Sequence, residues 1–419
     1  MSSSLINGNE IKIYEDQVKE YDILKEIIAS RDQEDAFYIL DLGDIIKKHR
    51  NWLKKMPRVV PHFAIKCNPD PTVIKILAAM NASFDCASPQ EIEQVMQYGV
   101  TPDRIIFANP TKCPSQIKFA KNVGVDKMTV DNELELYKIK NLFPEAKIII
   151  RFRCDSNSNL TKFINLGIKF GCDPGDEANK LIQISKNLGL TLHGFSFHVG
   201  SPCSDFSAYT YGIEICKHLI VFAKSIGCKD IKIIDIGGGF PGDSEFRIDE
   251  LANVINDAVD KLDSDIQVVS EPGRYYVESA FTLAAYIHSK RTISDENGLR
   301  HMYFANCGVY SGFIEELLNL CSRHPISLFN PVSDKKYLST LWGPTLDSYD
   351  CIIKDTLLPE FQIGDWLVWS DMGAYTSSLA FKFNGFEPPV VYPFIRKSQW
   401  EEFCDITRYN MNYWLCKLE

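Results

Sequence analysis

A lysine closes an apolar stretch near residue 66, and its setting suits covalent chemistry. The run Pro61-His62-Phe63-Ala64-Ile65-Lys66 predicts a β-strand, which Asn68-Pro69 then interrupts. Partial desolvation at such a place lowers the pKa of an ammonium group, so the free amine that forms a Schiff base with a carbonyl becomes accessible near neutral pH. Lys66 is therefore a candidate anchor for a covalently held cofactor. A lysine that snorkels from a core strand to the surface is the alternative.

Two glycine-containing stretches supply groups that bind a phosphate. In Gly237-Gly238-Gly239 the backbone can approach a ligand closely, and successive N–H groups can cradle an anion. A tight turn between a strand and a helix explains these glycines equally well. The stretch Ser270-Glu271-Pro272-Gly273-Arg274 adds a guanidinium suited to a phosphate and a carboxylate that can hold a protonated ring nitrogen. A surface ion pair is the alternative there.

A histidine follows another apolar run, Gly194-Phe195-Ser196-Phe197. Gly200 and Ser201 leave space beside His198, which suits a flat ring stacked on the imidazole. The Ser201 hydroxyl can join a phosphate site. A buried histidine that serves only the core is the alternative.

The elements that must position these residues form a regular alternation. From Ala36 onward, short apolar runs alternate with amphipathic stretches, which predicts repeated βα units and a parallel sheet. Eight such units close most naturally into a (β/α)8 barrel, with a doubly wound open sheet as the rival. The expected strands are His62 to Lys66, Ser83 to Cys86, Arg104 to Ala108, Lys127 to Val130, Ile148 to Arg153, Leu192 to Phe197, Lys232 to Ile236 and Ile266 to Ser270.

In this register the candidate residues gather at one rim of the barrel, where barrel active sites form. They stand in or just after the expected strands: Lys66, Asp85, Arg151, His198, Gly237 to Gly239, Glu271 and Arg274. After Gly273, short apolar runs are separated by turns rather than by helical patterns. We therefore expect an α/β chain with a (β/α)8 barrel over 35–273, and a mainly antiparallel β domain formed by 1–34 and 274–419.

The composition limits the classes of partner. The 419 residues exceed one ordinary domain, and 45% hydrophobic with 24% charged residues is typical of a globular protein. A net charge of -10 argues against nucleic acid or an anionic membrane as the main partner. We expect no signal peptide, since residues 1–30 contain no apolar core of that type, and no membrane span, since no apolar run approaches the required length. The thirteen cysteines include no Cys-x-x-Cys pair and no cluster at zinc spacing, which indicates reduced thiols in the cytoplasm and no metal site.

From about residue 34 to 388, motifs in order resemble those of eukaryotic ornithine decarboxylase. They are Phe63 to Asn68, Phe84 to Ser88, Phe197 to Ser201, Asp235 to Gly242, Glu271 to Tyr276, Gly343 to Thr345 and Met372 to Thr376. The resemblance implies the alanine-racemase-like fold, a barrel plus a β domain, and pyridoxal 5'-phosphate as cofactor. It implies decarboxylation of an amino acid, by default L-ornithine to putrescine and CO2 in polyamine biosynthesis.

The resemblance also assigns roles. Lys66 would form the internal aldimine, His198 would lie on the face of the pyridine ring, and Glu271 would hold the pyridinium proton, so that the ring accepts the electrons of the carbanion left by loss of CO2. Asp85 and Arg151 match supporting positions. The phosphate would rest on Gly237, Gly238, Gly239, Ser201, Arg274 and Tyr375. Family members are homodimers with shared active sites, and Tyr310, Asp347 and Asp350 match residues of that interface.

The substrate half of the site departs from the family. Leu346 replaces a cysteine that assists protonation of the decarboxylated intermediate, and leucine can neither donate nor accept a proton. Leu318 and Asn319 align with a Tyr-Asp pair that meets the distal amine of the substrate, and Cys307 stands where aspartate is usual. Three hypotheses follow: an ornithine decarboxylase, a decarboxylase with a shifted amino-acid substrate, or a non-catalytic regulator like the antizyme inhibitors.

A basic segment bears on the third hypothesis. The region from Lys118 to Lys140 resembles the antizyme-binding region of the animal enzyme, with positive charge from Lys118, Lys121, Lys138 and Lys140. Two solvated faces of barrel helices explain these lysines equally well. The third hypothesis is weakened because such regulators have typically lost several cofactor-holding residues, whereas those residues are all present here.

Overall fold

A computed structural model describes residues 3–6, 9–30, 34–154, 168–296, 298–329 and 335–407. The chain forms two compact units, one of Met1–Ile45 with Val277–Glu419 and one of Ile46–Tyr276. Within the described residues, no helix combines the length and the apolar character needed to cross a membrane.

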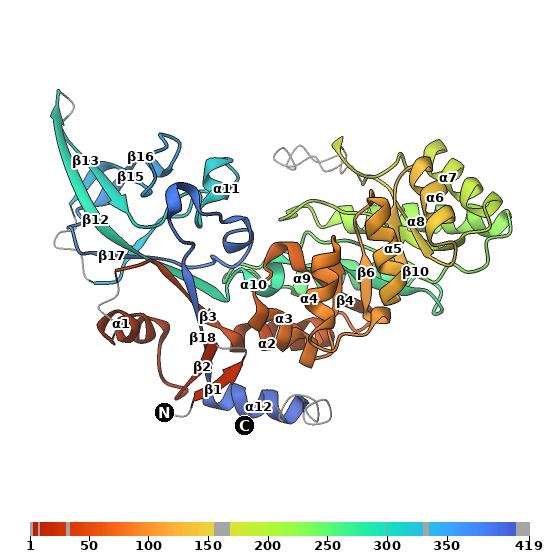
Figure 1. Cartoon of the computed structure of the whole chain (residues 1–419), viewed down its shortest axis with the longest axis horizontal. Coiled ribbons are helices and arrows are strands. Elements are labelled where there is room, and N and C mark those ends of the chain that lie inside the picture. Colours follow the sequence, from red (N-terminus) through yellow and green to blue (C-terminus); the bar gives the residue numbers. More distant parts are fainter. Residues whose placement is uncertain are drawn as a thin grey trace. The chain divides into compact units, whose positions relative to one another are not determined.

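Unit Ile46–Tyr276 is a closed parallel barrel, as the sequence predicts (Figure 1). The seventh and eighth strands pair in parallel, and the eighth pairs in parallel with the first through Val268 and Val59, so the sheet has no free edge. This closure excludes the open doubly wound sheet. The strands are β4 (Val59–Ala64), β5 (Ser83–Cys86), β6 (Ile105–Phe107), β7 (Lys127–Val130), β8 (Lys147–Arg151), β9 (Thr191–Ser196), β10 (Ile233–Asp235) and β11 (Gln267–Ser270).

Helices follow the barrel strands in sequence, and several start at residues with the expected capping chemistry. Ser88 accepts a hydrogen bond from Glu91 N at the start of α4, where Pro89 takes the first helical position. Asn132 accepts from Glu135 N at the start of α6 in the same way. The helices from α2 to α10 are α2 (Leu42–Lys55), α3 (Pro71–Ala79), α4 (Pro89–Met96), α5 (Pro114–Val123), α6 (Glu133–Leu142), α7 (Asp176–Asn187), α8 (Ser207–Ser225), α9 (Asp249–Val259) and α10 (Arg274–Val277).

The other unit is built on a mixed sheet. Its strands are β1 (Ser3–Ile6), β2 (Asn9–Tyr14), β3 (Phe37–Asp41), β12 (Phe281–Asp295), β13 (Gly298–Ala305), β14 (Ile326–Ser327), β15 (Lys336–Trp342), β16 (Cys351–Pro359), β17 (Trp366–Trp369) and β18 (Val390–Arg396). Among the described residues, six of the nine strand pairings are antiparallel, which agrees with the mainly antiparallel prediction. Strand β18 lies between β2 and β3 and pairs with both in parallel.

The sheet unit takes more of the N-terminal chain than the expected residues 1–34. Strand β3 pairs with β12 and β18, so its residues belong to the sheet. Its core gathers apolar side chains from both parts of the chain, among them Leu24, Phe37, Trp366 and Phe394, beside α1 (Glu20–Ser30). Short helices complete the unit, namely α11 (Ile314–Leu317), α12 (Lys397–Thr407) and the 3-10 turns Ser377–Leu379 and Phe383–Gly385.

Candidate active site

Lys66 lies just beyond a barrel strand, with a carboxylate beside it. Strand β4 ends at Ala64, two residues earlier than expected, and Lys66 occupies the 3-10 turn Ile65–Cys67 that follows. Its ammonium forms an ion pair with Asp85 Oδ2, while 42% of the lysine side chain stays exposed. Asp85 belongs to β5 and is buried, and its second oxygen has no hydrogen-bond donor among the described residues. The lysine side chain is thus partly open to solvent, whereas its anionic partner is buried.

His198 follows β9 and is held as a neutral imidazole. Desolvation lowers its pKa well below the usual value, and the positive charges of Arg151 and Lys66 act in the same direction. The Gly200 N–H donates to His198 Nδ1 at 3.0 Å, so the ring proton is on Nε2. A neutral ring fixed in this way can stack on a flat heteroaromatic group without repelling a protonated one.

The three glycines after β10 form a close-packed backbone loop. Gly237 and Gly239 adopt left-handed φ angles of 65° and 106°. A Cβ atom at Gly237 would lie 2.3 Å from Phe197 O, and one at Gly238 would lie 2.8 Å from His198 Nε2. Only glycine therefore fits, and the loop presents backbone rather than side chains next to the imidazole. This is the arrangement that a phosphate cradle requires.

Arg274 and Ser201 lie together beside this loop. Arg274 begins α10 and is buried, and its Nε donates to Ser201 Oγ at 3.4 Å. A Cβ atom at Gly242 would lie 2.1 Å from Arg274 O, so the segment after the glycine loop packs directly on the arginine backbone. The predicted hydroxyl and guanidinium partners for a phosphate are thus adjacent.

Glu271 completes the cluster of titratable groups. Burial raises its pKa well above the usual value, and the neighbouring carboxyl groups of Asp235 and Asp85 raise it further. The positive charges of Lys66 and Arg151 act on the Glu271 pKa in the opposite direction. The structure brings together every predicted residue of the barrel unit, but their individual catalytic roles stay predictions.

The remaining predicted residues belong to the sheet unit. Tyr310 donates a hydrogen bond to Asp347 Oδ2, which holds the Asp347 pKa below its usual value. Asp350 is buried, and it accepts hydrogen bonds from Val309 N at 2.8 Å and from Thr345 Oγ1 at 2.7 Å. Asp350 therefore fixes two loops of this unit, a contribution that the sequence does not indicate. Tyr375 adopts a left-handed backbone with φ 54°. The proposed ligand roles of these residues stay predictions.

Three of the substrate departures, Leu346, Leu318 and Asn319, lie at the surface of the same unit, whereas Cys307 is buried and its thiol lies 3.3 Å from Ser311 Oγ. The Leu346 side chain is 93% exposed, and Leu318 is exposed as well. Asn319 has a left-handed φ of 55°, at the end of the turn that follows α11. The two buried glutamates that precede it, Glu315 and Glu316, both form ion pairs with Arg323. Arg323 therefore offsets one of the two negative charges that precede Asn319 in the chain.

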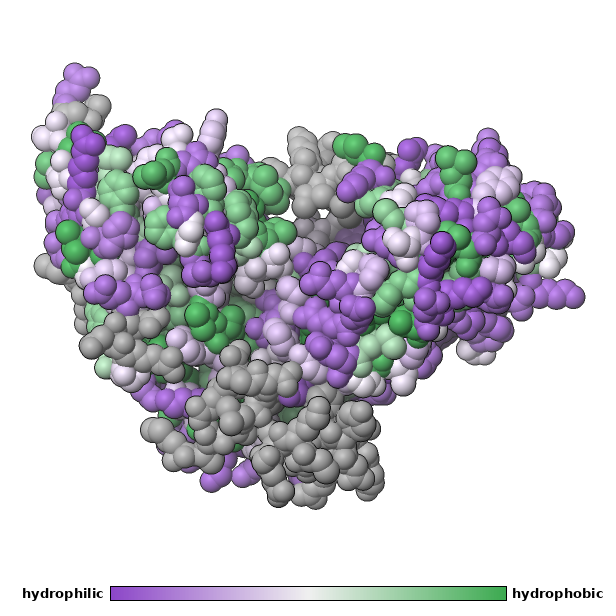
Figure 2. All heavy atoms as spheres, in the orientation of Figure 1, coloured by the Kyte–Doolittle hydropathy of each residue, from purple (hydrophilic) through white to green (hydrophobic). Residues whose placement is uncertain are grey.

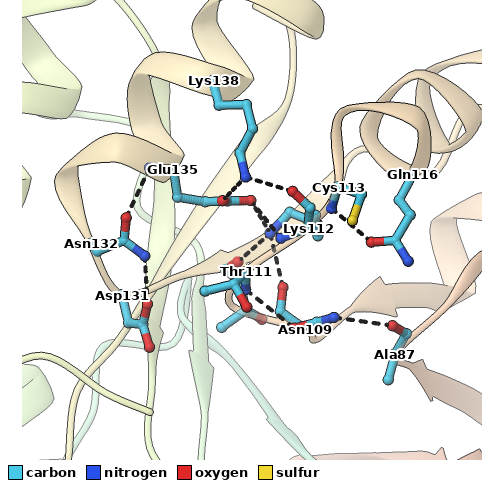
Figure 3. Close-up of polar contacts among 11 residues, drawn as sticks. Ala87, Asn109, Thr111, Lys112, Cys113, Gln116, Asp131, Asn132, Glu135 and Lys138 are labelled. Carbon is cyan, nitrogen blue, oxygen red and sulfur yellow. Dashed lines mark hydrogen bonds and ion pairs between the residues drawn. The ribbon is translucent and has the colours of Figure 1, made fainter. Parts of the chain in front are cut away.

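A second lysine cluster, which sequence reasoning missed, joins the loop after β6 to strand β7 and helix α6 (Figure 3). The Lys112 side chain is 0% exposed, and its ammonium donates to Thr129 O at 2.8 Å and Asn109 O at 2.9 Å. Glu135 lies 3.1 Å from the same ammonium and also pairs with Lys138 at 2.6 Å. Burial lowers the pKa of Lys112 to about 8. The signal in the sequence is a lysine shortly after an Asn-Pro pair that ends a strand.

Taken together, the barrel residues fit pyridoxal phosphate. The test is chemical: an exposed amine for the aldehyde, a neutral ring to stack, a glycine cradle with an arginine and a serine for the phosphate, and buried carboxyl groups for the ring nitrogen. Among the described residues, one buried Asp85 oxygen in the same cluster has no hydrogen-bond donor. The fold and this site define a pyridoxal-phosphate protein of the barrel type.

Comparison with known proteins agrees with this class. The family model described as "Pyridoxal-dependent decarboxylase, pyridoxal binding domain" matches residues 42–278. The chain is 41% identical to antizyme inhibitor 2 of Xenopus laevis, over 94% of this chain and 90% of that protein. It is 40% identical to ornithine decarboxylase of Rattus norvegicus, over 89% and 84%. The crystal structure of arginine decarboxylase from Paramecium bursaria Chlorella virus superposes with a TM-score of 0.84 at 36% identity, covering 89% of this chain and 100% of that one.

The chain belongs to the ornithine decarboxylase family of pyridoxal-dependent decarboxylases, and its cofactor is pyridoxal phosphate. Both the fold and the cofactor expected from the sequence are thereby confirmed.

Proposed function

We propose that this protein is an amino-acid decarboxylase that acts by default on L-ornithine and yields putrescine and CO2. The observation that carries the proposal is the complete and chemically consistent set of cofactor residues in the barrel unit. The bound cofactor supplies a ring that accepts the electron pair freed when the carboxylate leaves. All other steps use residues of this chain.

Each barrel residue has a task in that reaction. Lys66 would supply the amine for the aldehyde of the cofactor, and Asp85 pairs with that amine in the structure. His198, which is neutral and fixed by the Gly200 N–H, would offer a flat surface for the ring. The Arg274 guanidinium and the glycine loop would hold the phosphate, and Glu271 would hold the proton of the ring nitrogen.

The residues expected to bind the substrate differ from those of the family. Losing one partner of a buried charge pair costs about 2 to 5 kcal/mol, or roughly 30-fold to several thousandfold in affinity. Asn319 replaces the aspartate that would meet the distal ammonium, and Arg323 already pairs with Glu315 and Glu316. Asp347 remains as an anionic contact. A shifted substrate, with a less cationic or more apolar side chain, is therefore the second candidate function.

A third candidate is a non-catalytic antizyme-inhibitor-like regulator. Two observations favour it: the similarity to Xenopus laevis antizyme inhibitor 2, and Leu346 in place of the protonating cysteine. In the basic segment, Lys118 and Lys121 are exposed, whereas the Lys138 ammonium is bound to Glu135. A pull-down with antizyme would compare the wild type with Lys118→Glu/Lys121→Glu, and Lys224→Glu on α8 is the matched control. Equal recovery of antizyme with all three proteins would exclude this patch.

We also propose a cytoplasmic homodimer with shared active sites. The Tyr310 ring contacts Phe381 and Phe383, and both phenylalanines are exposed, as are Leu346 and Tyr349. Apolar residues gather on the face of this unit around α11 (Figure 2). A second copy would cover this apolar surface. Sedimentation equilibrium tests the dimer, and a monomer at micromolar concentration would contradict it.

The deciding experiment is CO2 release from carboxyl-labelled L-ornithine by protein saturated with pyridoxal phosphate. Release at an enzyme-like rate supports the default substrate, and Leu346→Cys should then increase the yield of putrescine over products of misdirected protonation. Absence of release with bound cofactor, followed by release from another amino acid in a panel, supports the shifted substrate. No release from any amino acid would refute a decarboxylase function.

A further inference from the structure

The residue behind Glu271 is Asp235, the last residue of β10, which is 0% exposed. Its Oδ1 accepts a hydrogen bond from Gly237 N at 2.8 Å. Gly237 O in turn accepts from Glu271 N at 2.7 Å and from Ser270 Oγ at 2.7 Å. The glycine loop therefore ties the end of β10 to the end of β11, which fixes the two acidic residues relative to each other.

The second oxygen of Asp235 indicates a proton between the two carboxyl groups. Among the described residues, no N–H or O–H group donates to Asp235 Oδ2. The Glu271 carboxyl group acts on the Asp235 side chain, and the two residues are tied together through Gly237. Two ionised carboxylates cannot bond to each other, and an unsatisfied buried anion is expensive. A single proton between them satisfies the orphaned oxygen.

Burial and the neighbouring charges favour one bound proton on the Asp235–Glu271 pair. Burial raises the pKa of Asp235 to about 6, and burial followed by Asp235 raises that of Glu271 well above its usual value. The third carboxyl group nearby, Asp85, forms its ion pair with Lys66. The titratable and charged groups that act on the pair come from several elements: Asp85 of β5, Arg151 of β8, Lys66 of the 3-10 turn and Cys216 of α8.

We infer that Asp235 is a positioning residue: the two carboxyl groups share one proton at neutral pH, and when the positively charged ring nitrogen of the cofactor lies against Glu271, this proton resides on Asp235, which donates it to one Glu271 oxygen and leaves the other to accept from the ring nitrogen. In the protein without cofactor the proton lies on Glu271, because the pKa of Glu271 is raised further than that of Asp235. No covalent bond forms or breaks, and the pair keeps a net charge of minus one. The inference rests on the cofactor of the family and not on the identity of the substrate.

Infrared spectroscopy tests the shared proton directly. The holoprotein, labelled with ¹³C at the aspartate and glutamate carboxyl groups, should show at pH 7.5 the isotope-shifted carbonyl stretch of a protonated, buried carboxyl group. This band should disappear in both Asp235→Asn and Glu271→Gln, because an amide then donates the hydrogen bond and the remaining carboxyl group ionises. Asp70→Asn should retain it, since asparagine replaces this half-buried N-cap of α3 without touching the pair. A wild-type spectrum without the band would overturn the inference.

Cofactor affinity separates a neutral donor from an anion. Asp235→Asn resembles the protonated carboxyl group and should bind pyridoxal phosphate within about threefold of the wild type, whereas Asp235→Ala removes the donor and should bind about 10- to 100-fold more weakly. If Asp235→Asn binds as weakly as Asp235→Ala, Asp235 acts as an anion and the inference fails. If Asp235→Ala does not fold, the wild-type spectrum and Asp235→Asn still decide. Neither readout involves turnover, so an inactive protein would leave the test intact.

Discussion

Lys66 and Lys112 both stand next to an Asn-Pro pair, follow strands of the same barrel and pair with a buried carboxylate, yet their surroundings differ. The Lys66 side chain is 42% exposed, and one oxygen of its carboxylate partner, Asp85, has no donor within the part of the chain that the structure describes. The Lys112 side chain is 0% exposed, and its ammonium meets two carbonyl oxygens and Glu135. The Lys66 side chain is therefore open to a reagent, whereas the Lys112 side chain is buried and hydrogen-bonded.

The contrast shows what makes a lysine reactive in this fold. Burial lowers the pKa of Lys112 to about 8, which by itself would favour the free amine needed for Schiff-base chemistry. Without access, that amine cannot meet a carbonyl compound. A reactive lysine at the barrel rim therefore needs an exposed side chain as well as an available free amine. A lowered pKa alone is found in structural lysines as readily as in catalytic ones.

The largest effect is expected at Lys66. Lys66→Ala should abolish the covalent link to the cofactor and reduce decarboxylation by about 10²- to 10⁴-fold, the range for loss of a positioned reacting group. Borohydride reduction followed by mass spectrometry should place the cofactor on Lys66 in the wild type and nowhere in the variant. An adduct that persists in Lys66→Ala would remove this lysine from the mechanism.

Lys112 should act on stability instead. Lys112→Met leaves the buried Glu135 with Lys138 as its remaining cationic partner and should lower the free energy of unfolding by about 3 to 5 kcal/mol. The added change Glu135→Gln should recover part of this loss. Denaturant titration gives both values, and borohydride trapping at Lys66 provides the control that the folded variant still binds cofactor. Loss of trapping in a folded Lys112→Met protein would contradict the division of roles.

The same lysine predicts a pH dependence with a definite sign. The unfolded chain keeps its proton on Lys112 up to about pH 10.5, whereas the folded protein releases it near pH 8. Between these values the unfolded state binds more protons, so the contribution of Lys112 to stability rises with pH by up to about 1.4 kcal/mol per unit. Unfolding free energies of the wild type at pH 7.5 and 9.5, minus those of Lys112→Met, should show this rise. A difference that falls or stays flat would mean that Lys112 keeps its charge.

The smallest effect is expected at an exposed lysine near this cluster. Lys121 on α5 pairs with Glu145 at 3.3 Å, and both side chains are largely solvated. Lys121→Ala should change the free energy of unfolding by less than about 1 kcal/mol. High salt should remove most of that difference, because the solvent screens such a pair. A loss as large as that of Lys112→Met would show that burial is not what separates these lysines.

Most of the barrel could be predicted from the sequence because each strand is a short apolar run between turn residues. Ser83–Cys86 and Lys127–Val130 have the predicted bounds, and the other barrel strands differ by a few residues at their ends. The mixed pairing of the sheet unit was not predictable. Strand β18 joins β2 and β3 across nearly the whole chain, and local periodicity carries no information about such distant partners.

The site divides in the same way. Lys66, His198 and Glu271 could be predicted because each follows an apolar run at a rim where chemistry gathers. The prediction placed Lys66 within a strand, but the chain leaves the sheet at Ala64, since the 3-10 turn is needed to bring the amine to Asp85. Asp235 and Lys112 were missed, because their roles depend on partners from elsewhere in the chain. The partner of Asp235 follows a neighbouring strand, and the partner of Lys112 lies on a helix. A sequence shows that a residue is charged but not which charge it meets.

The position of β18 between β2 and β3 has a consequence for biosynthesis. The barrel is encoded by one continuous segment, Ile46–Tyr276, so it can fold as soon as that segment has left the ribosome. The sheet cannot form so early, because β2 and β3 pair with β18, and β18 (Val390–Arg396) is synthesised near the end of the chain. Until then they carry unpaired edges. A nascent chain stalled before residue 390 should therefore resist protease over the barrel and be cleaved within its first forty residues.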